Sequence, residues 1–335
     1  MIKKCCSNIL FYSIVCIAMF GSTGCQREQA SNFVKVSNPV FERPMADPSV
    51  VIYDDTFYIF ATQDPWGGDT LACYSTSDFV NWDEHELNWP TKQACTSTTG
   101  NQNKVWAPSV VRAPNGKFYM YVSIGSEVWC GVADEPAGPW RNVFDDQRPL
   151  VRHQEGSPVH SIDAECFIDD DGKCYLYWGS GWNWVNGHCM AVELEPDMFT
   201  FATEPQDITP PHYFEGPFMI KHDGLYYLTY SDGKCTNDTY KVRYSVGKTP
   251  FGPFTEGTNS PILSSDIERE ILGPGHHCIF MLDGKYYIAY HRHKRPYNAE
   301  TLLRQICFDK LEFGGNGLIE KVYPTDEGVQ LRPLK

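Results

Sequence analysis

Basic side chains are scarce in this sequence. It contains 28 Lys and Arg residues against 42 Asp and Glu residues, which gives a formal net charge of -14 at pH 7. A surface this acidic repels the phosphate backbone of nucleic acids and the headgroups of anionic lipids. The composition therefore argues against a nucleic-acid partner.

Cysteine pairs with the spacing of a zinc site are also missing. The chain contains 13 cysteines, but none of them form a C-x-x-C pair, so a structural zinc site is not expected. Nine cysteines lie beyond residue 25, and an odd number cannot all pair within one chain. Cys166, Cys174 and Cys278 lie in strand-like apolar runs, where cysteine is usually a small buried hydrophobic residue. We therefore predict few disulfides.

The apolar stretch near the start of the chain, residues 9–20, is too short for a comfortable membrane-spanning helix. Lys3 and Lys4 precede it, and small residues lead from it into Cys25. The arrangement resembles a bacterial lipoprotein signal, in which the chain is cut before the cysteine and its thiol is acylated. We expect residues 1–24 to be a signal peptide and residues 25–38 to be a lipidated Cys25 with its tether.

Two residues near Cys25 refine this expectation. The lipoprotein pattern prefers Leu three residues before the cysteine, where this chain has Ser22, so a plain secretory signal remains the alternative. Gln26 follows the cysteine in place of the Asp that retains such proteins at the inner membrane. The resemblance therefore implies a lipid anchor in the outer membrane of a Gram-negative cell, on its periplasmic or cell-surface side.

The remainder of the chain repeats one pattern five times. Each copy has a strand-like run, a tight turn and an aromatic second run, and the copies begin at Asp47, Ala107, Asp163, Glu215 and Gly275. Four copies turn at Asn-Gly or Asp-Gly, a strong hairpin signal, whereas the first turns at Asp54-Asp55 and is one residue shorter. The starting positions are separated by 60, 56, 52 and 60 residues, and no segment shows a helical period.

Five such units with about four strands each predict an all-β fold, a five-bladed β-propeller that forms a single domain over residues 39–335. A β-sandwich would also be all-β, but it would not explain five similar hairpins at nearly equal spacing.

Acidic residues recur at one position of the repeat. Aligned on the turn, Asp47, Asp163 and Glu215 occupy the place that Ala107 and Gly275 fill in the other two copies. The innermost strands of a propeller line its channel, so we expect these acids to converge at its mouth. Carboxylates forced together repel one another, and such an arrangement is typical of glycoside hydrolysis. A cation site built from carboxylates is the alternative.

Five sequence fragments resemble glycoside hydrolase family 43 in the order of that family. They are Ala46-Asp47-Pro48-Ser49-Val50, Trp106-Ala107-Pro108-Ser109-Val110, Ile162-Asp163-Ala164, Phe214-Glu215-Gly216-Pro217 and Gly273-Pro274-Gly275-His276-His277. The resemblance implies a five-bladed propeller and inverting hydrolysis, commonly of α-L-arabinofuranosides and β-D-xylosides. It implies that Asp47 is the general base, Glu215 the general acid, and Asp163 the carboxylate that raises the pKa of the acid and orients it. Inversion requires the base and acid to lie about 6.5–9.5 Å apart.

The family resemblance and the context of the loops suggest substrate-binding residues. Trp106 corresponds to an aromatic wall of the sugar subsite, and Trp66 lies in an exposed Gly/Pro-containing loop where it can stack on a sugar. Trp182 and Trp184 are further candidates. For the arginine that several family members place near the sugar, Arg292 and Arg304 are both candidates, and the spacing does not choose between them. Trp106 can equally be a packing residue.

His276 corresponds to a histidine that points into the central channel, where it holds a water molecule or a calcium ion. A hydrogen-bonded core histidine is the alternative. Calcium is thus a possible structural occupant, and no cofactor is expected to be required. Residues 291–295, a basic cluster, are interpreted as a solvated loop.

The sequence therefore predicts an exo-acting α-L-arabinofuranosidase that acts on plant polysaccharide side chains or oligosaccharides. The enzyme alternatives are a β-D-xylosidase and an endo-arabinanase. The contrasting alternative is a surface glycan-binding propeller without catalysis.

Overall fold

The computed structural model describes residues 1, 33–97, 99 and 104–335. The expected signal peptide and Cys25 lie outside these residues. Within the described part, the only helical segment is the 3₁₀ turn η1 (Trp182–Trp184), and no helix there is long and apolar enough to cross a membrane. All nine described cysteines are buried and free.

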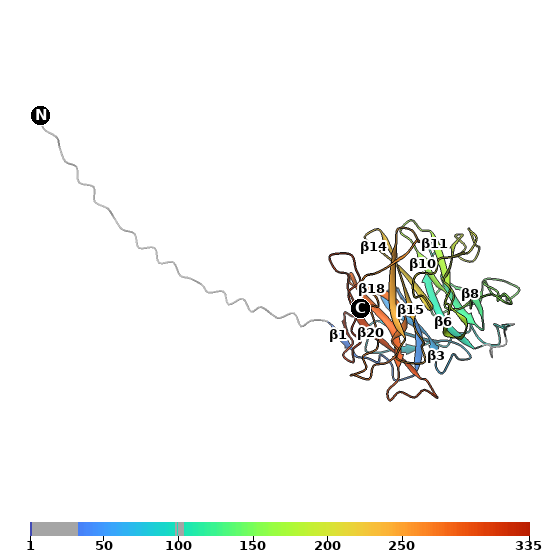
Figure 1. Cartoon of the computed structure of the whole chain (residues 1–335), viewed down its shortest axis with the longest axis horizontal. Helices are drawn as coiled ribbons and strands as arrows, with labels where there is room; N and C mark the ends of the chain where they lie inside the picture. The colour runs from blue at the N-terminus through green and yellow to red at the C-terminus, as the bar shows by residue number, and fades with distance from the viewer. Residues whose placement is uncertain (2–32, 98, 100–103) are drawn as a thin grey trace. The chain divides into compact units, whose positions relative to one another are not determined.

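Strands β2 to β20 form five antiparallel sheets, each built from consecutive strands (Figure 1). Blade one is β2 (Met45–Tyr53), β3 (Thr56–Gln63), β4 (Ala72–Thr76) and β5 (Asp83–Glu84). Blade two is β6 (Val105–Arg112), β7 (Phe118–Ile124), β8 (Glu127–Ala133) and β9 (Arg141–Asn142). Blade three is β10 (Glu165–Ile168), β11 (Cys174–Trp178), β12 (Met190–Leu194) and β13 (Gln206–Asp207). Blade four is β14 (Glu215–His222), β15 (Leu225–Asp232), β16 (Lys241–Gly247) and β17 (Thr255–Glu256), and blade five is β18 (Gly275–Leu282), β19 (Lys285–His293) and β20 (Arg304–Leu311).

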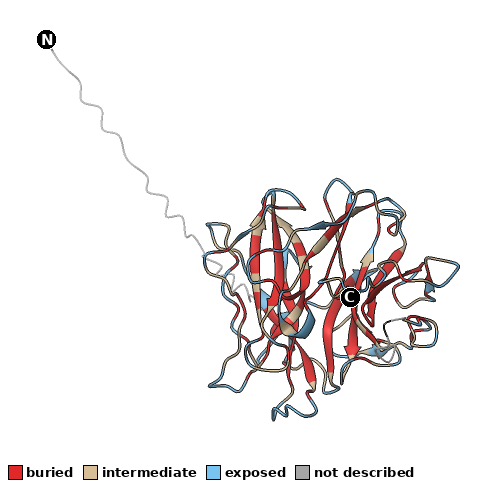
Figure 2. Cartoon of the chain, turned by 45° about the vertical axis from the view of Figure 1, so that its right-hand side comes forward, coloured by how far each residue is buried: buried red, intermediate tan, exposed pale blue. Residues whose placement is uncertain are grey.

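The five blades close into a ring. Their first strands contact one another in the order β2, β6, β10, β14, β18 and back to β2. A separate hydrophobic cluster fills each of the five junctions between neighbouring blades. Figure 2 shows the strands mostly buried and the exposed residues gathered on the connecting loops. The predicted five-bladed β-propeller is confirmed.

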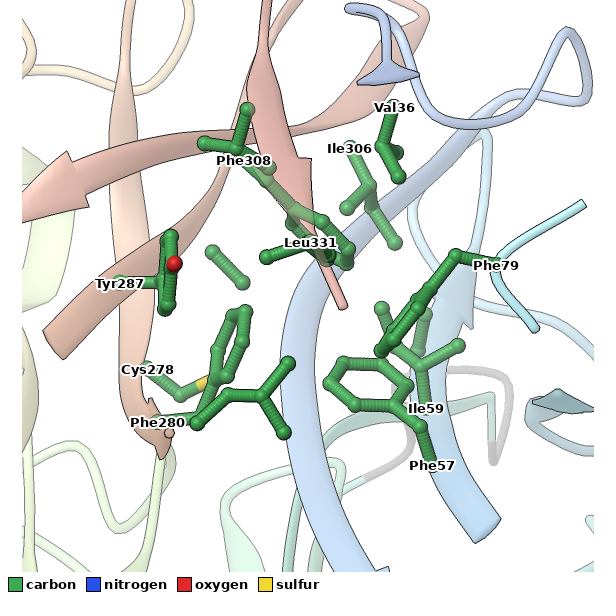
Figure 3. Close-up of a cluster of buried hydrophobic side chains, with 14 of the residues drawn as sticks. Val36, Phe57, Ile59, Phe79, Cys278, Phe280, Tyr287, Ile306, Phe308 and Leu331 are labelled. Atoms are coloured by element: carbon green, nitrogen blue, oxygen red, sulfur yellow. The ribbon is translucent and has the colours of Figure 1, made fainter. Parts of the chain in front are cut away.

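The junction between blades one and five receives both ends of the folded chain. β1 (Val34–Val36) pairs antiparallel with β21 (Val329–Leu331). Figure 3 shows Val36 and Leu331 in one apolar cluster with Phe57 of blade one and Phe308 of blade five. This cluster joins residues that are far apart in sequence, so it closes the ring.

A side chain completes the short fifth blade. The Asn38 Oδ1 accepts a hydrogen bond from the Phe308 N–H (2.7 Å), and the Asn38 Nδ2 donates to the Phe308 carbonyl (2.9 Å). The Val40 N–H donates to the Ile306 carbonyl at 2.8 Å. The chain at residues 38–40 therefore runs along the free edge of β20 as a substitute for a fourth strand.

This closure moves the predicted domain boundary. The sequence placed the end of the tether at residue 38, but β1 and Asn38 belong to the compact unit that begins at Phe33. The sequence did not reveal this three-residue strand, because its pairing partner lies almost three hundred residues away at the other end of the chain.

Turn lengths also differ from the expectation. Blades one, four and five turn through two residues, because Tyr53 pairs with Thr56, His222 with Leu225, and Leu282 with Lys285. Blades two and three turn through five residues, between Arg112 and Phe118 and between Ile168 and Cys174. The first copy is therefore not shortened. The second and third copies are longer.

The true equivalence of the repeats is consequently shifted by one residue in blades four and five. A left-handed residue recurs near the start of each first strand: Asp47 (φ 53°), Ala107 (φ 46°), Asp163 (φ 58°), Gly216 (φ 58°) and His276 (φ 39°). In the four blades other than blade three, this residue lies in a break of the strand register. Glu215 is thus one position before the place that Asp47 and Asp163 share, and the alignment on the turns was wrong there.

Replacing Asn38 with Ala tests the closure. The change leaves the buried N–H and carbonyl of Phe308 without their partner, so we expect the free energy of unfolding to fall by about 2–3 kcal/mol. Urea unfolding of the protein measures the change. Asn316→Ala, in an exposed turn, is the matched control and should have a smaller effect; equal losses in the two variants would contradict the role of Asn38.

Candidate active site

One pocket brings the three repeat acids together. It has a volume of about 490 Å³, and Asp47, Asp163 and Glu215 all line it. The three side chains come from the first-strand ends of blades one, three and four, and each residue is buried. His276 and Arg304 line the same pocket from blade five.

The backbone irregularity at each first strand places these groups. A left-handed conformation is uncommon for a residue other than glycine, although Asp tolerates it better than most, and such residues cluster at functional sites. Asp47 and Asp163 both adopt it. In blade four the equivalent residue is Gly216, which supplies a backbone N–H to the Asp163 carboxylate.

Asp47 lies among hydrogen-bond donors and positive charge. The Arg304 Nη1 donates to Oδ1 at 3.2 Å, and the Thr62 hydroxyl donates to Oδ2 at 2.7 Å. The Nδ1 atoms of His291 and His276 lie 3.1 Å and 3.4 Å from Oδ1. Burial by itself would raise the pKa of Asp47, but Arg304 and the two imidazoles hold this pKa well below its usual value. Asp47 is therefore ionised at neutral pH.

Arg304 is held in place by a second carboxylate. Its Nε and Nη2 donate to Asp64 Oδ2 (3.0 Å) and Oδ1 (2.6 Å), and its backbone N–H donates to Asp64 Oδ2 (2.7 Å). The guanidinium carbon lies 5.4 Å from the centre of the Trp66 ring. A bidentate pair of this kind fixes the plane of the guanidinium as well as its position.

Of the two candidate arginines, the structure places only Arg304 in the pocket. Arg292 is 2% exposed, and its Nη2 donates to Asp326 at 2.7 Å. It does not line the pocket. The proposal of Arg292 as a sugar ligand was therefore wrong.

Glu215 lies among weaker partners. The Tyr240 hydroxyl donates to Oε1 at 2.8 Å, and the Ser180 hydroxyl lies within hydrogen-bonding distance of Oε2 at 3.2 Å. Burial raises the pKa of Glu215 to about 7, with the charge of Asp47 adding to the rise while the bonds from Tyr240 and Ser180 oppose it. Glu215 thus keeps its proton up to near-neutral pH.

The pKa of Asp163 responds to both of these acids. Burial, followed by the charges of Glu215 and Asp47, raises the pKa of Asp163 well above its usual value. Two buried carboxyls whose charges repel each other cannot both ionise readily, so their titrations are coupled. At neutral pH the Asp163–Glu215 pair therefore retains at least one proton.

The Nδ1 of His276 lies between Asp47 and Asp163, at 3.4 Å and 3.5 Å from their nearest oxygens. Burial lowers the pKa of His276, and Asp47 opposes that change. Calcium binds six to eight oxygen ligands, and no group of three or more His, Cys, Asp or Glu side chains in the described chain is arranged to hold a metal ion. Calcium at His276 stays a prediction, and no chemical step is assigned to it.

The predicted tryptophans surround the pocket. Trp66, Trp106, Trp182 and Trp184 all line it. Trp182 stacks on His160 with ring centres 4.2 Å apart and donates its indole N–H to the Ser157 carbonyl at 3.0 Å. Several aromatic faces around a few polar groups form the usual composition of a binding pocket for a small organic molecule.

Sequence reasoning missed a stacked pair behind the acids. Tyr240, which bonds to Glu215, lies parallel to His291 with ring centres 5.7 Å apart and an angle of 6°. The interpretation of residues 291–295 as a solvated loop was wrong for residues 291–293, which are buried at the end of β19. The only signal in the sequence was that the aromatic run of the strand continues directly into these residues, which indicates that they belong to the strand and that the loop begins at Lys294.

The comparisons with known proteins agree with this geometry. The model of glycosyl hydrolases family 43 matches residues 36–319. A β-D-galactofuranosidase of Aspergillus niger is 33% identical over 90% of this chain and 88% of its own length. An arabinoxylan arabinofuranohydrolase of Bacillus subtilis is 26% identical over 98% of this chain and 72% of its own. The solved α-L-arabinofuranosidase from Clostridium thermocellum is 26% identical, with a TM-score of 0.66 over 86% of this chain and 95% of that one.

A family model that covers most of the chain agrees with the five-bladed propeller and with the pocket in which the three acids meet. The protein therefore belongs to glycosyl hydrolases family 43 and is an O-glycosyl hydrolase.

Proposed function

We propose that the protein is an exo-acting α-L-arabinofuranosidase that removes terminal arabinose from plant oligosaccharides or polysaccharides. The observation that carries the proposal is that one pocket joins Asp47, whose carboxylate accepts a hydrogen bond from Arg304, to Glu215, a buried carboxyl whose pKa is raised to about 7. The names of two relatives, from Bacillus subtilis and Clostridium thermocellum, support arabinofuranoside as the substrate.

The two carboxyl groups have opposite tasks in this proposal. Asp47 removes a proton from the attacking water, and Arg304 keeps its carboxylate ionised for that purpose. Glu215 delivers its proton to the oxygen that leaves with the rest of the substrate. Burial raises the pKa of Glu215, and the family resemblance assigns Asp163 to raise it further and to orient the acid. Water enters opposite the leaving group, so the anomeric configuration inverts, as it does in the family.

A β-D-galactofuranosidase is the second candidate, because the Aspergillus niger relative is 33% identical over most of both chains. α-L-Arabinofuranose and β-D-galactofuranose have the same configuration around the ring and differ by one extra hydroxymethyl group on galactofuranose. A pocket discriminates weakly against one small added group unless it provides a steric barrier. The two substrates therefore belong in the same experiment.

The substrate is tested with nitrophenyl glycosides of α-L-arabinofuranose, β-D-galactofuranose and β-D-xylopyranose. We expect the highest kcat/KM on the arabinofuranoside. A higher value on the xyloside would contradict the proposal, and a higher value on the galactofuranoside would favour the second candidate.

Glu215→Gln should lose about 10²–10⁴-fold in kcat on an oligosaccharide but much less on a dinitrophenyl glycoside, whose leaving group needs no proton. Asp47→Asn should lose activity on both, and Glu300→Gln on an exposed segment is the control.

The pH dependence of kcat/KM tests the role of Tyr240. Glu215 must hold its proton, so activity should fall as the pH rises through about 7. The Tyr240 hydroxyl stabilises the ionised form of Glu215 and lowers its pKa, so Tyr240→Phe should move the basic limb of the profile to higher pH. A profile with an unchanged basic limb, or one moved to lower pH, would contradict this role. Tyr323→Phe, on an exposed side chain, is the control.

We also propose that the enzyme is exported and held at the outer membrane through a lipid on Cys25. The basic start, the apolar stretch and the small residues before this cysteine support the proposal. Labelled palmitate should be incorporated when the full chain is produced in a Gram-negative host, and Cys25→Ala should abolish incorporation and release the protein from the membrane fraction. Equal labelling of the two proteins would exclude Cys25 as the acylated residue.

A further inference from the structure

A second cavity of about 390 Å³ adjoins the active-site pocket. The two cavities share Trp184 and Phe214, so they meet at this pair of rings. The other walls of the second cavity come from residues 185–187, 209–210, 212–213, 232–234 and 239. Asp47 and Arg304 do not line it. The second cavity thus lies on the side of the active site that blades three and four form.

This side is where a leaving group must go. The general acid has to reach the oxygen that joins the terminal sugar to the remainder of the substrate. Glu215 follows Phe214 directly in the chain, and the residues just before Glu215 form a wall of the second cavity. Blades one and five supply Asp47 and Arg304 to the terminal-sugar pocket from the other side.

Close packing fixes the Trp184 loop against the Phe214 segment, where the two cavities meet. The rings of Trp184 and Phe214 lie 5.7 Å apart at 28°. A Cβ atom at Gly187 would lie 2.4 Å from the Phe214 carbonyl oxygen, so the loop approaches this segment more closely than any other residue would allow. Asn183, Trp184 and Asn186 all have positive φ angles, of 56°, 65° and 54°. Such strained conformations persist when surrounding packing fixes them, and they are often found at ligand-binding sites.

The chemistry of the second cavity suits a chain of neutral sugars. Trp184 is partly exposed and offers an aromatic face, while Lys234 and Asn186 add exposed polar groups. The Asp232 carboxylate in its wall accepts a hydrogen bond from Arg243 Nε at 2.7 Å, and Arg243 also pairs with Glu256 at 2.7 Å, so the charge of Asp232 is partly compensated. An aromatic face with a few polar groups binds the apolar face and the hydroxyl groups of a sugar together.

We infer that the second cavity binds the sugar residues of the leaving group, so that the substrate is an oligosaccharide or polysaccharide instead of a small glycoside. This inference rests on the proposed function, because it assigns Glu215 as the general acid. The sugars of a natural leaving group make contacts with this cavity. A nitrophenyl glycoside lacks them, because its leaving group is a single aromatic ring that reaches only the entrance of the cavity.

Val185→Trp tests the inference, because Val185 is 55% exposed and lines the second cavity but not the first. The indole should fill the cavity and lower kcat/KM at least tenfold on an arabinoxylo-oligosaccharide, while kcat/KM on the nitrophenyl arabinofuranoside changes less than twofold. Val80→Trp is the matched control, since Val80 is 64% exposed and lines neither cavity. Equal effects on both substrates, or no effect on the oligosaccharide, would overturn the inference.

A binding measurement separates this inference from the proposed function. In the Glu215→Gln background, calorimetry with the same arabinoxylo-oligosaccharide should show an affinity that Val185→Trp weakens at least tenfold and Val80→Trp leaves unchanged. That result supports the second cavity as a sugar site even if the unsubstituted enzyme prefers another terminal sugar. An affinity that Val185→Trp does not change, or no measurable binding, would overturn the inference, whereas hydrolysis of no furanoside at all would overturn the proposed function.

Discussion

The bridge that Arg304 makes between Asp64 and Asp47 is the interaction on which the active site depends. Three carboxyl groups lie buried in one pocket, and without a buried cation the ionised form of each would be strongly unfavourable. Arg304 compensates for two buried acids at once, Asp64 by three hydrogen bonds and Asp47 by one. Asp163 and Glu215 receive less compensation, and their pKa values rise. One cation therefore divides the acids into an ionised base and a pair that retains at least one proton.

The same bridge crosses the closure of the propeller. Asp47 and Asp64 belong to blade one, whereas Arg304, His276 and His291 belong to blade five. These two blades are the first and last of the chain, and their junction is held by the β1–β21 pair, the hydrogen bonds of Asn38 and the cluster around Phe57 and Phe308. Loosening that junction would separate the base from the groups that keep it ionised. The stability of the closure and the protonation of the site are therefore linked through one interface.

Most of the fold was predictable from the sequence, because the repeat is local. Asp-Gly and Asn-Gly turns with aromatic second strands appear within short segments, and five copies at similar spacing leave few arrangements other than a propeller. The β1 strand and the edge role of Asn38 were not predictable in this way. Their partners, β21 and Phe308, lie at the far end of the chain, and a single Asn has no pattern that marks it as a strand substitute.

The site was predictable to the level of its acids but not of their surroundings. Asp47, Asp163 and Glu215 begin recurring motifs, so the repeat itself marks them. The one-residue error at Glu215 arose because a two-residue turn and a five-residue turn share the same Asp-Gly letters. Tyr240, His291 and Asp64 lie outside the motifs, and only the packing of neighbouring blades shows what they contact.

The ring symmetry of the fold cannot by itself assign the chemical roles. Asp47 and Asp163 are the same residue type at the same backbone position with nearly the same φ, of 53° and 58°. Burial favours a raised pKa at both, but at Asp47 the charge of Arg304 and the two imidazoles together outweigh burial, whereas at Asp163 the charge of Glu215 adds to it, so the two pKa values move in opposite directions. The repeated backbone determines where a carboxyl group is held, and the adjacent blades determine whether it keeps its proton. A propeller with all five positions intact would therefore lose the division between base and acid if the neighbours of those positions were made alike.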